Sequence, residues 1–444
     1  MRLTDRHRRL LRRTFLDYQH HDAFAENPLI LSRAKGLHCW DVEGRRYFDG
    51  IAGVYAATLG HGHPRVVEAV TRQLERLPFA PPMHGTADVT LDFVERMGQV
   101  TPGRLDFVKS FSGGSESMEA AIKFARQYFR QTGRPGKYKF VSRYQGYHGA
   151  TLGAMAASGT GPRKSPFEPG PAGFLKVFPP THYRDRFDSW EECNRFAAQQ
   201  VEDVIVHEDP ETVAGVILEP VSNTGGVITP TAEYFRILRE ICDRHEVLLI
   251  FDEIITACGR TGSMFAAQTY GVTPDIICGG KGLSSGAVPL GAMMARLDMA
   301  DAFQRPGSTN FAHGHTYAGH PVACAAGIAV IDEIVEQGLD RRARELGERL
   351  AAGLEDLRRH GVVREVRGKG LLRGVELVRE EGSTEPFPEL GAALKRTALA
   401  NGLILRVDPS WFAVGPALTI DEAGVDELCE RIDRSLADAL AGLR

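Results

Sequence analysis

Residues 247–254 read Val-Leu-Leu-Ile-Phe-Asp-Glu-Ile, and residues 275–283 read Asp-Ile-Ile-Cys-Gly-Gly-Lys-Gly-Leu. The first run is a short, almost wholly apolar segment of the kind that forms a strand buried on both faces. The second is another apolar strand that breaks into glycines. The pattern predicts two buried strands, one ending on Asp252 and the other presenting Lys281 just beyond its end.

A lysine in an apolar site loses solvation of its charged form, so its pKa falls and the neutral amine can form a Schiff base. An aspartate that binds a pyridinium nitrogen is the partner required by pyridoxal 5′-phosphate (PLP), whose protonated ring is the electron sink. Lys281 and Asp252 together therefore suggest a PLP enzyme. On these two residues alone, an alternative is equally open: Lys281 could be a snorkelling lysine and Asp252 an ordinary carboxylate at a strand end, with no role in catalysis.

Strand and helix patterns alternate from about residue 105 to 295. Strands are expected at 105–111, 137–142, 214–221 and 291–295 in addition to the two above, with helices at 116–131 and 233–244. This alternation predicts an α/β fold with a mostly parallel sheet covered by helices on both faces. Ligands of such sheets bind at the carboxyl ends of the strands, where Asp252 and Lys281 both fall.

The two ends of the chain have a different pattern. Residues 41–49 predict a hairpin that turns at Glu43-Gly44, and the segment after 320 predicts two helices, strands at 362–366 and 370–377, and a final helix from Asp421. We expect residues 1–55 and 326–444 to form a smaller α+β domain beside a large domain of residues 56–325. The arginine-rich first thirteen residues predict a basic N-terminal helix.

Composition excludes several classes of protein. The net charge of −4 and the lack of a long basic block argue against nucleic acid as a partner. No run of eighteen apolar residues is present, so a membrane-spanning helix is not expected. The seven cysteines are scattered, and none belongs to a Cys-x-x-Cys pair. This pattern indicates neither a disulfide framework nor a zinc site, and it suits a protein of the reducing cytoplasm.

Other strand ends carry candidate site residues. Ser112-Gly-Gly-Ser-Glu-Ser117 joins a strand to a helix, where Ser115 and backbone N–H groups can approach a phosphate or simply cap the helix. Tyr147 and Glu219 follow two further strands. Residues 311–321 contain three histidines, but their spacing is not that of a helical ligand pair and no carboxylate is nearby in the sequence, so no metal is predicted. His61-Gly-His63-Pro64 is expected to be only a turn.

Taken jointly, these segments resemble the class III, or ω-, aminotransferases of PLP fold type I. The matching motifs are SGGSES (112–117), YHG (147–149), ILEPV (217–221), FDEI (251–254), GRTG (259–262), GGKGLSSG (279–286), GHTYAGHP (314–321) and GKGLLRGVEL (368–377). They occur in the family's order and at its spacings. The resemblance extends from about residue 25 to the end of the chain.

The resemblance implies a role for each matching residue. Lys281 is the expected Schiff-base lysine and Asp252 the pyridinium partner, whereas Tyr147 and Ile254 are expected to pack on opposite faces of the cofactor ring. The other implied cofactor-binding residues are Gly114, Ser115, Glu219 and, from the partner subunit of a homodimer or a dimer of dimers, Thr316. The implied substrate-binding residues are Tyr55 and Arg406, an arginine whose fork suits a carboxylate.

The chain departs from the family at several positions. Ser112 stands where Asn is frequent, and Ala257-Cys258-Gly259 where GFG is frequent. Ile255 and Thr224 replace the Gln and the Glu of many glutamate-handling members. The last two departures predict pyruvate, rather than 2-oxoglutarate, as the amino acceptor.

The predicted function is a transaminase that moves an amino group from a terminal amine or ω-amino acid to a 2-oxo acid by ping-pong kinetics. A PLP-dependent lyase, aminomutase or racemase is the alternative, because the same residues support each of these reactions. A non-enzymatic PLP-binding sensor is a more remote alternative.

Overall fold

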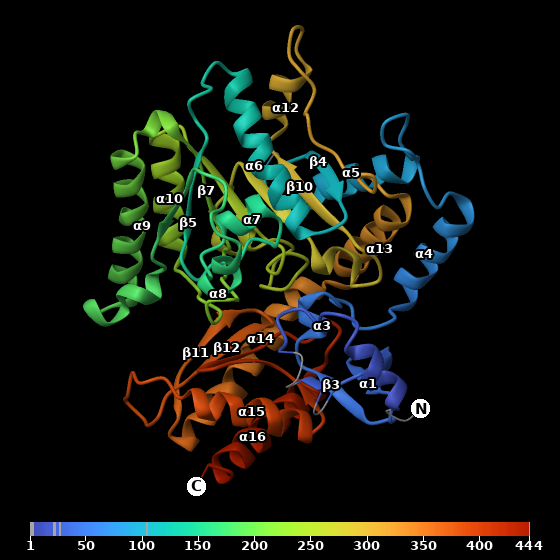
Figure 1. Ribbon diagram of the computed structural model, residues 1–444, viewed down its shortest axis with the longest axis vertical. Helices are drawn as coiled ribbons and strands as arrows, with labels where there is room; N and C mark the ends of the chain where they lie inside the picture. The colour runs from blue at the N-terminus through green and yellow to red at the C-terminus, as the bar shows by residue number, and fades with distance from the viewer. Residues whose placement is uncertain (1–3, 21–23, 26–27, 104, 444) are drawn as a thin grey trace.

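The structure is a computed structural model that describes every residue except 1–3, 21–23, 26–27, 104 and 444. A seven-stranded sheet with its helices forms the upper part of the molecule in Figure 1, and two four-stranded sheets with their helices form the lower part. The upper part contains the strand ends to which the sequence assigns the site.

The large sheet has the strand order β4-β10-β9-β8-β7-β5-β6. Its strands pair in parallel except β10, which is antiparallel to both β4 and β9. The mostly parallel α/β sheet predicted from the sequence is thus confirmed. In chain order the strands are β4 (Phe107–Phe111), β5 (Lys139–Arg143), β6 (Phe174–Val177), β7 (Val213–Leu218), β8 (Leu248–Asp252), β9 (Ile276–Gly279) and β10 (Gly291–Ala295).

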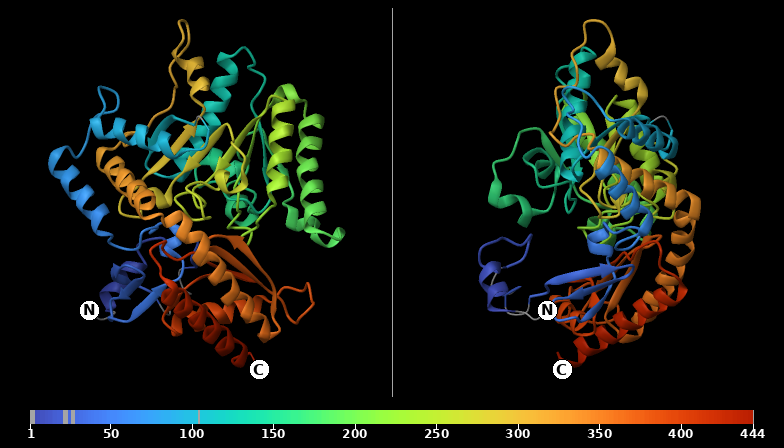
Figure 2. Two further views of the ribbon diagram at one scale, coloured as in Figure 1. Left: turned by 180° about the vertical axis from the view of Figure 1, so that it is seen from behind. Right: turned by 90° about the vertical axis from the view of Figure 1, so that its right-hand side faces the viewer.

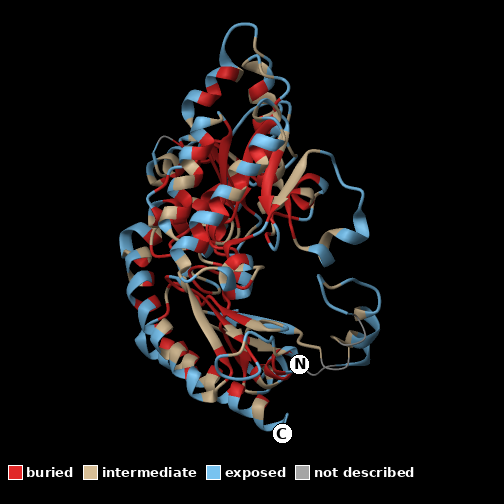
Figure 3. Ribbon diagram, turned by 90° about the vertical axis from the view of Figure 1, so that its left-hand side faces the viewer, coloured by how far each residue is buried: buried red, intermediate tan, exposed pale blue. Residues whose placement is uncertain are grey.

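Helices cover both faces of this sheet because alternate residues of each strand point to opposite faces. In β8, Leu248 and Ile250 pack in a core with α6, whereas Leu249 and Phe251 pack in a core with α5, α9, α10 and α13. Figure 3 shows the buried residues concentrated on the sheet and on the inner sides of these helices. The helices are α4 (Pro64–Arg76), α5 (Asp88–Val100), α6 (Gly114–Gln131), α7 (Leu152–Ala157), α8 (Gly161–Lys164), α9 (Trp190–His207), α10 (Ala232–Arg244), α11 (Ala266–Tyr270), α12 (Leu297–Gln304) and α13 (Pro321–Gln337).

The lower part joins the two ends of the chain. Its first sheet has the order β1-β2-β3-β13, in which Leu403 of the C-terminal segment lies in parallel register with Phe48 of the N-terminal hairpin. Its second sheet has the order β11-β12-β15-β14. Figure 2 shows the N-terminal and C-terminal segments side by side in both views. The domain boundaries at residues 55 and 325 stay a prediction.

The elements of the lower part include the expected hairpin, basic helix and final helix. The strands are β1 (Leu31–Lys35), β2 (His38–Asp41), β3 (Arg46–Asp49), β11 (Val363–Lys369), β12 (Leu372–Leu377), β13 (Leu403–Ile404), β14 (Arg406–Asp408) and β15 (Trp411–Val414). The helices are α1 (Asp5–Leu11), α14 (Leu339–Glu355), α15 (Pro388–Ala400) and α16 (Glu422–Ala441), together with the short turn α3 (Ala52–Tyr55). In the described part of the chain, no helix combines the length and the apolarity needed to cross a membrane.

Candidate active site

One cavity of about 210 Å³ lies at the carboxyl ends of the central strands. Seven of the ten residues assigned to the site from the sequence line it. Their positions follow from the parallel strands, whose carboxyl ends meet at one edge of the sheet. These residues are Gly114, Ser115, Tyr147, Glu219, Asp252, Ile254 and Lys281. His148, Gly149, Val221, Ile255 and Thr256 complete the lining.

Lys281 sits in a strained turn directly after β9. Its backbone φ is +42°, in the left-handed region that a residue with a side chain enters at a cost. Burial lowers the pKa of Lys281 to about 8, although the carboxylates of Asp252 and Glu219 oppose the shift. No hydrogen bond to another described residue engages its Nζ. The side-chain amine of Lys281 is therefore partly deprotonated, and so partly neutral, near pH 8.

Asp252, the last residue of β8, is held by two donors. Its Oδ2 lies 2.8 Å from Nδ1 of His148, and its Oδ1 accepts a hydrogen bond of 3.1 Å from the Ile254 N–H. The carboxylate can only accept, so Nδ1 carries the proton. The His148 side chain is 1% exposed, and its Nε2 has no hydrogen-bond partner within the described part of the chain. In the sequence His148 is part of the YHG motif, but no local pattern marks it as the partner of Asp252.

The N-terminus of α6 forms one wall of the cavity. The first N–H groups of a helix lack intrahelical partners and favour an anion such as a phosphate. Gly114 begins this helix against Ile254, and a Cβ at position 114 would lie only 2.6 Å from Ile254 Cδ1. Ser115 Oγ accepts a hydrogen bond of 3.0 Å from the Ala150 N–H. Only glycine at position 114 allows the helix end to approach Ile254 this closely.

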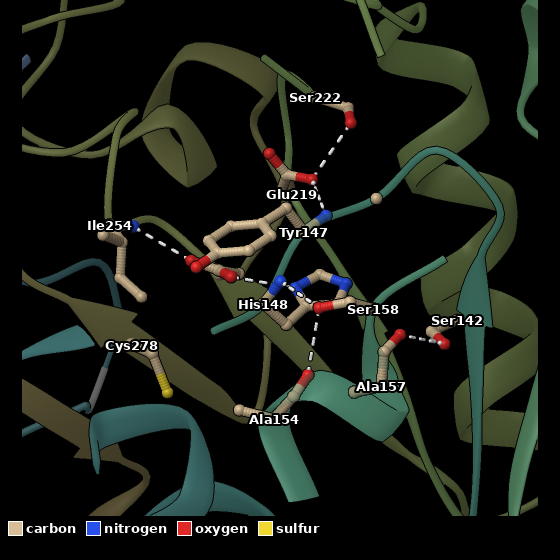
Figure 4. A network of polar contacts seen from close by, with 12 residues as sticks. Ser142, Tyr147, His148, Ala154, Ala157, Ser158, Glu219, Ser222, Ile254 and Cys278 are labelled. Carbon is tan, nitrogen blue, oxygen red and sulfur yellow. Dashed lines mark hydrogen bonds and ion pairs between the residues drawn. The ribbon is translucent and has the colours of Figure 1, made fainter. Parts of the chain in front are cut away.

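Glu219 orients the residues around Tyr147. Its Oε1 accepts hydrogen bonds from the Tyr147 N–H at 2.9 Å and from Ser222 Oγ at 3.0 Å, and its Oε2 accepts one from the Asn223 N–H at 3.2 Å. Figure 4 shows Glu219 between Ser222 and Tyr147, with His148 on the neighbouring part of the network. Burial raises the pKa of Glu219. Glu219 is thus a structural anchor of the cavity as well as part of its lining.

Tyr147 also contacts the N-terminal segment. Its hydroxyl lies 3.1 Å from the hydroxyl of Tyr18, and the Arg163 guanidinium lies 4.1 Å from the Tyr18 ring centroid and 5.0 Å from that of Tyr147. Tyr18 is not among the site residues predicted from the sequence. No local motif marks it, because its contact joins residues 129 positions apart.

Tyr55 does not line the cavity but is fully buried close to it. Residues 52–55 all have positive φ, and this left-handed turn is held by Asp49, whose carboxylate accepts from the N–H groups of Ile51 (3.2 Å) and Gly53 (2.7 Å). The Tyr55 hydroxyl donates to Oδ1 of Asn223 at 3.1 Å. The turn thereby connects Tyr55 to the loop that follows Glu219.

The expectation that His61 does no more than form a turn was wrong. His61 Nε2 lies 2.7 Å from Asp49 Oδ2, and this contact raises the pKa of His61 to about 10. Cys39, Asp49 and His61 also bring potential metal-ligand atoms within 4.8 Å of one another, away from the lining of the Lys281 cavity. His61 thus supports the Asp49 carboxylate that holds the Tyr55 turn.

Arg406 and Thr316 also lie outside the lining. Arg406 lies in register with Ala413 of β15, two residues before Gly415, and a Cβ at Gly415 would lie 2.6 Å from the Tyr55 ring, so Arg406 is on the Tyr55 side of the cavity. Burial raises the pKa of Tyr55 and lowers that of Lys281, and the charge of Arg406 acts to lower both. Thr316 is exposed in the loop between α12 and α13. In the same loop His315 Nδ1 lies 3.8 Å from Glu116 Oε1, so a carboxylate that is distant in sequence does approach these histidines.

The donor set of the cavity fits PLP. A helix N-terminus with Ser115 suits the phosphate, and Asp252, with one oxygen held by His148, suits the pyridinium nitrogen. Tyr147 and Ile254 supply ring and aliphatic surfaces, and Lys281 supplies the amine. The residues present match each part of the cofactor.

Comparison with known proteins agrees with this fit. The family model described as "Aminotransferase class-III" matches residues 21–436. A probable aminotransferase of Mycobacterium tuberculosis is 40% identical over 379 residues, which cover 85% of this chain and 81% of that protein. Crystal structures of an (S)-enantioselective ω-transaminase from Thermomicrobium roseum and of an ω-transaminase from Pseudomonas jessenii in complex with PMP both superpose with a TM-score of 0.93. The first is 37% identical and covers 97% of both chains, and the second is 32% identical and covers 98% of both.

The match to the family model spans most of the chain, and the relatives cover most of it at well above 30% identity. The chain therefore belongs to the class III aminotransferases, enzymes whose cofactor is PLP.

Proposed function

We propose that this aminotransferase moves an amino group from a terminal amine or ω-amino acid to a 2-oxo acid, with pyruvate as acceptor and Lys281 as the Schiff-base lysine. One observation carries the proposal: Lys281 and Asp252 face the same cavity, with the N-terminus of α6 in its wall. The ω-transaminases among the structural neighbours support the donor class. The two half-reactions share this cavity, so ping-pong kinetics are expected.

Bound PLP supplies an aldehyde that condenses with amines and a protonated ring that takes up the electron pair left at the substrate carbon. With PLP bound, Lys281 Nζ would act as the general base that takes the proton from the substrate carbon and as the general acid that delivers it to C4′ of the cofactor, a task suited to a pKa near 8. Asp252 would keep a proton on the ring nitrogen of the bound cofactor, and His148 holds the Asp252 carboxylate in place. Tyr147 and Ile254, which line the same cavity, would pack against the ring.

The choice of acceptor depends on the cations near Lys281. The charges of Arg406 and Arg163 both reach Lys281, but Arg163 is stacked on Tyr18 and Tyr147. We assign the carboxylate clamp to Arg406, as the resemblance to the family implies, and one such arginine suits a small mono-acid. Thr224 lies in another cavity, of about 560 Å³, and provides no acidic group there. None of the described residues that line the Lys281 cavity is an arginine, so a second substrate carboxylate there would be desolvated without a guanidinium partner.

A shared site in a homodimer is also part of the proposal. Thr316 is exposed and lies outside the cavity of its own chain. Exposed apolar side chains that include Met83 and Tyr317 offer a surface for a second copy.

All seven cysteines are free, which supports a reducing, cytoplasmic location.

A panel of amines assayed with pyruvate and with 2-oxoglutarate tests the proposal. Amination of pyruvate, with interconversion of the cofactor absorption bands in each half-reaction, is the expected result. A lyase, aminomutase or racemase would transform the amine without aminating the added 2-oxo acid. A kcat/KM that favours 2-oxoglutarate by about tenfold or more would show that the acceptor assignment is wrong, since one tenfold step corresponds to about 1.4 kcal/mol of differential transition-state binding.

A further inference from the structure

Arg406 is paired with an acid from its own strand. Arg406 and Asp408 are two residues apart in β14, so their side chains project from the same face. Arg406 Nε lies 3.1 Å from Asp408 Oδ2, and the guanidinium lies 4.9 Å from the centroid of the Trp411 ring on the adjacent strand β15. The Arg406 side chain is only 16% exposed. The arginine therefore has a fixed resting position with a counter-ion and an aromatic surface.

This resting pair lies next to the reaction cavity. Arg406 lies in register with Ala413 of β15, two residues before Gly415, and a Cβ at Gly415 would lie only 2.6 Å from the Tyr55 ring. Tyr55 in turn donates to Asn223, in the loop that follows the cavity residue Glu219. The pair therefore lies on the Tyr55 side of the cavity, in agreement with the opposite effects of the two charges on the pKa of Tyr55, which burial raises.

An arginine that meets both a carboxylate substrate and an uncharged substrate needs a counter-ion of its own. A 2-oxo acid brings a carboxylate to Arg406, but an uncharged amine donor leaves the guanidinium without one. A largely buried, unpaired guanidinium is costly. Thr224 and Ile255 provide no acid, whereas Asp408 already stands within hydrogen-bond distance.

We propose that Asp408 is the resident counter-ion of Arg406, released when a substrate carboxylate binds and re-engaged when the donor is uncharged. Asp408 is then a specificity-determining residue. It competes with carboxylate ligands for Arg406 and favours donors that lack a carboxylate. This inference rests on the proposed function, in which Arg406 is the carboxylate clamp.

Asp408→Asn in the holoenzyme separates the two effects, because it removes the charge at nearly constant volume. We expect KM for pyruvate to fall about 2- to 5-fold, and kcat/KM for an uncharged monoamine to fall by a similar factor, the range for a partly exposed ion pair. Propionate, a carboxylate that cannot be aminated, should bind more tightly by the same factor in a calorimetric titration. Asp408→Glu, which keeps the charge, should stay close to the wild type.

Two controls identify the origin of the effect. Asp426→Asn breaks an exposed ion pair between Asp426 of α16 and Arg349 of α14 and should change none of these quantities. In an Arg406→Ala background, Asp408→Asn should no longer alter propionate affinity. Parallel losses for acceptor and donor, or unchanged propionate affinity in Asp408→Asn, would overturn the inference.

The propionate measurement also keeps this inference separate from the proposed function. A wild-type enzyme that aminates no 2-oxo acid would refute the proposed function. Propionate binding requires no turnover and would still report whether Asp408 competes for Arg406. If Asp408→Asn does not fold, the affinities of Asp408→Glu and Asp408→Ser for propionate provide the same comparison: the serine variant should bind it more tightly, and equal affinities would refute the inference.

Discussion

His148 Nδ1 lies 2.8 Å from Asp252 Oδ2, and both side chains are almost completely buried. The hydrogen bond leaves Asp252 in one orientation at the end of β8. A charge-assisted bond of this kind contributes about 1.5–3 kcal/mol. His148 is therefore a positioning residue for the carboxylate to which we assign the nitrogen of the cofactor ring.

His148→Phe should lower kcat by about tenfold or more, because Asp252 loses a charge-assisted donor. His148→Asn places an amide donor near the position of Nδ1 and should recover much of the loss. The pH dependence of the cofactor absorbance reports the protonation of the ring directly. Equal losses in both variants, with an unchanged pH dependence, would indicate a packing role instead.

Asp252→Asn should retain the cofactor but lose activity by about 10²-fold or more, because a neutral amide does not stabilise a pyridinium charge. Cofactor content, measured by absorbance after desalting, separates loss of binding from loss of chemistry. A variant with near-normal kcat would show that the ring partner is another residue.

Lys281→Ala should abolish turnover, while PLP can still bind through its phosphate. Borohydride reduction of the wild type followed by peptide mass spectrometry should find the pyridoxyl label on Lys281. Lys176 is a stringent internal control, since burial lowers its pKa to about 7 and it would be labelled if low basicity alone selected the lysine. Label on any lysine other than 281 contradicts the assignment.

Uptake of PLP by the apoenzyme should become faster as the pH rises towards about 8 and then level off. The pKa of Lys281 is lowered to about 8, so its amine is protonated and unreactive below that pH and neutral above it. Stopped-flow absorbance measures the rate of bond formation. Lys281→Ala, which binds without that bond, reports the pH dependence of the cofactor itself. A wild-type rate with the same profile as this variant would contradict the prediction.

Thr316 should act across the subunit interface. Mixing Lys281→Ala chains with Thr316→Ala chains places both lesions in one site of a heterodimer and leaves its other site intact. Random exchange should then restore about a quarter of wild-type activity, as expected for a two-fold symmetric dimer. No recovery after subunit exchange, or an active monomer by light scattering, would refute the shared site.

The sequence by itself determined the α/β sheet and much of the candidate cavity. Strands β7, β8 and β9 are apolar runs, and Glu219, Asp252 and Lys281 stand at or just beyond their carboxyl ends, which parallel strands bring to one edge of the sheet. Helix α6 follows β4 directly, so the glycines at their junction also reach that edge. These placements depend on local pattern and on one general rule of topology.

Only the tertiary structure decided the partners of these residues. Tyr18 reaches Tyr147, Tyr55 reaches Asn223, and His148 reaches Asp252, across separations of 129, 168 and 104 residues. Such contacts depend on how loops and lobes pack, which no local pattern encodes. Arg406 and Asp408 are two residues apart in sequence. Their ion pair can compete with a bound substrate only because β14 lies beside the cavity, and the tertiary structure decides that position. Strand periodicity is a property of a few consecutive residues, whereas side-chain partnership is a property of the packed molecule.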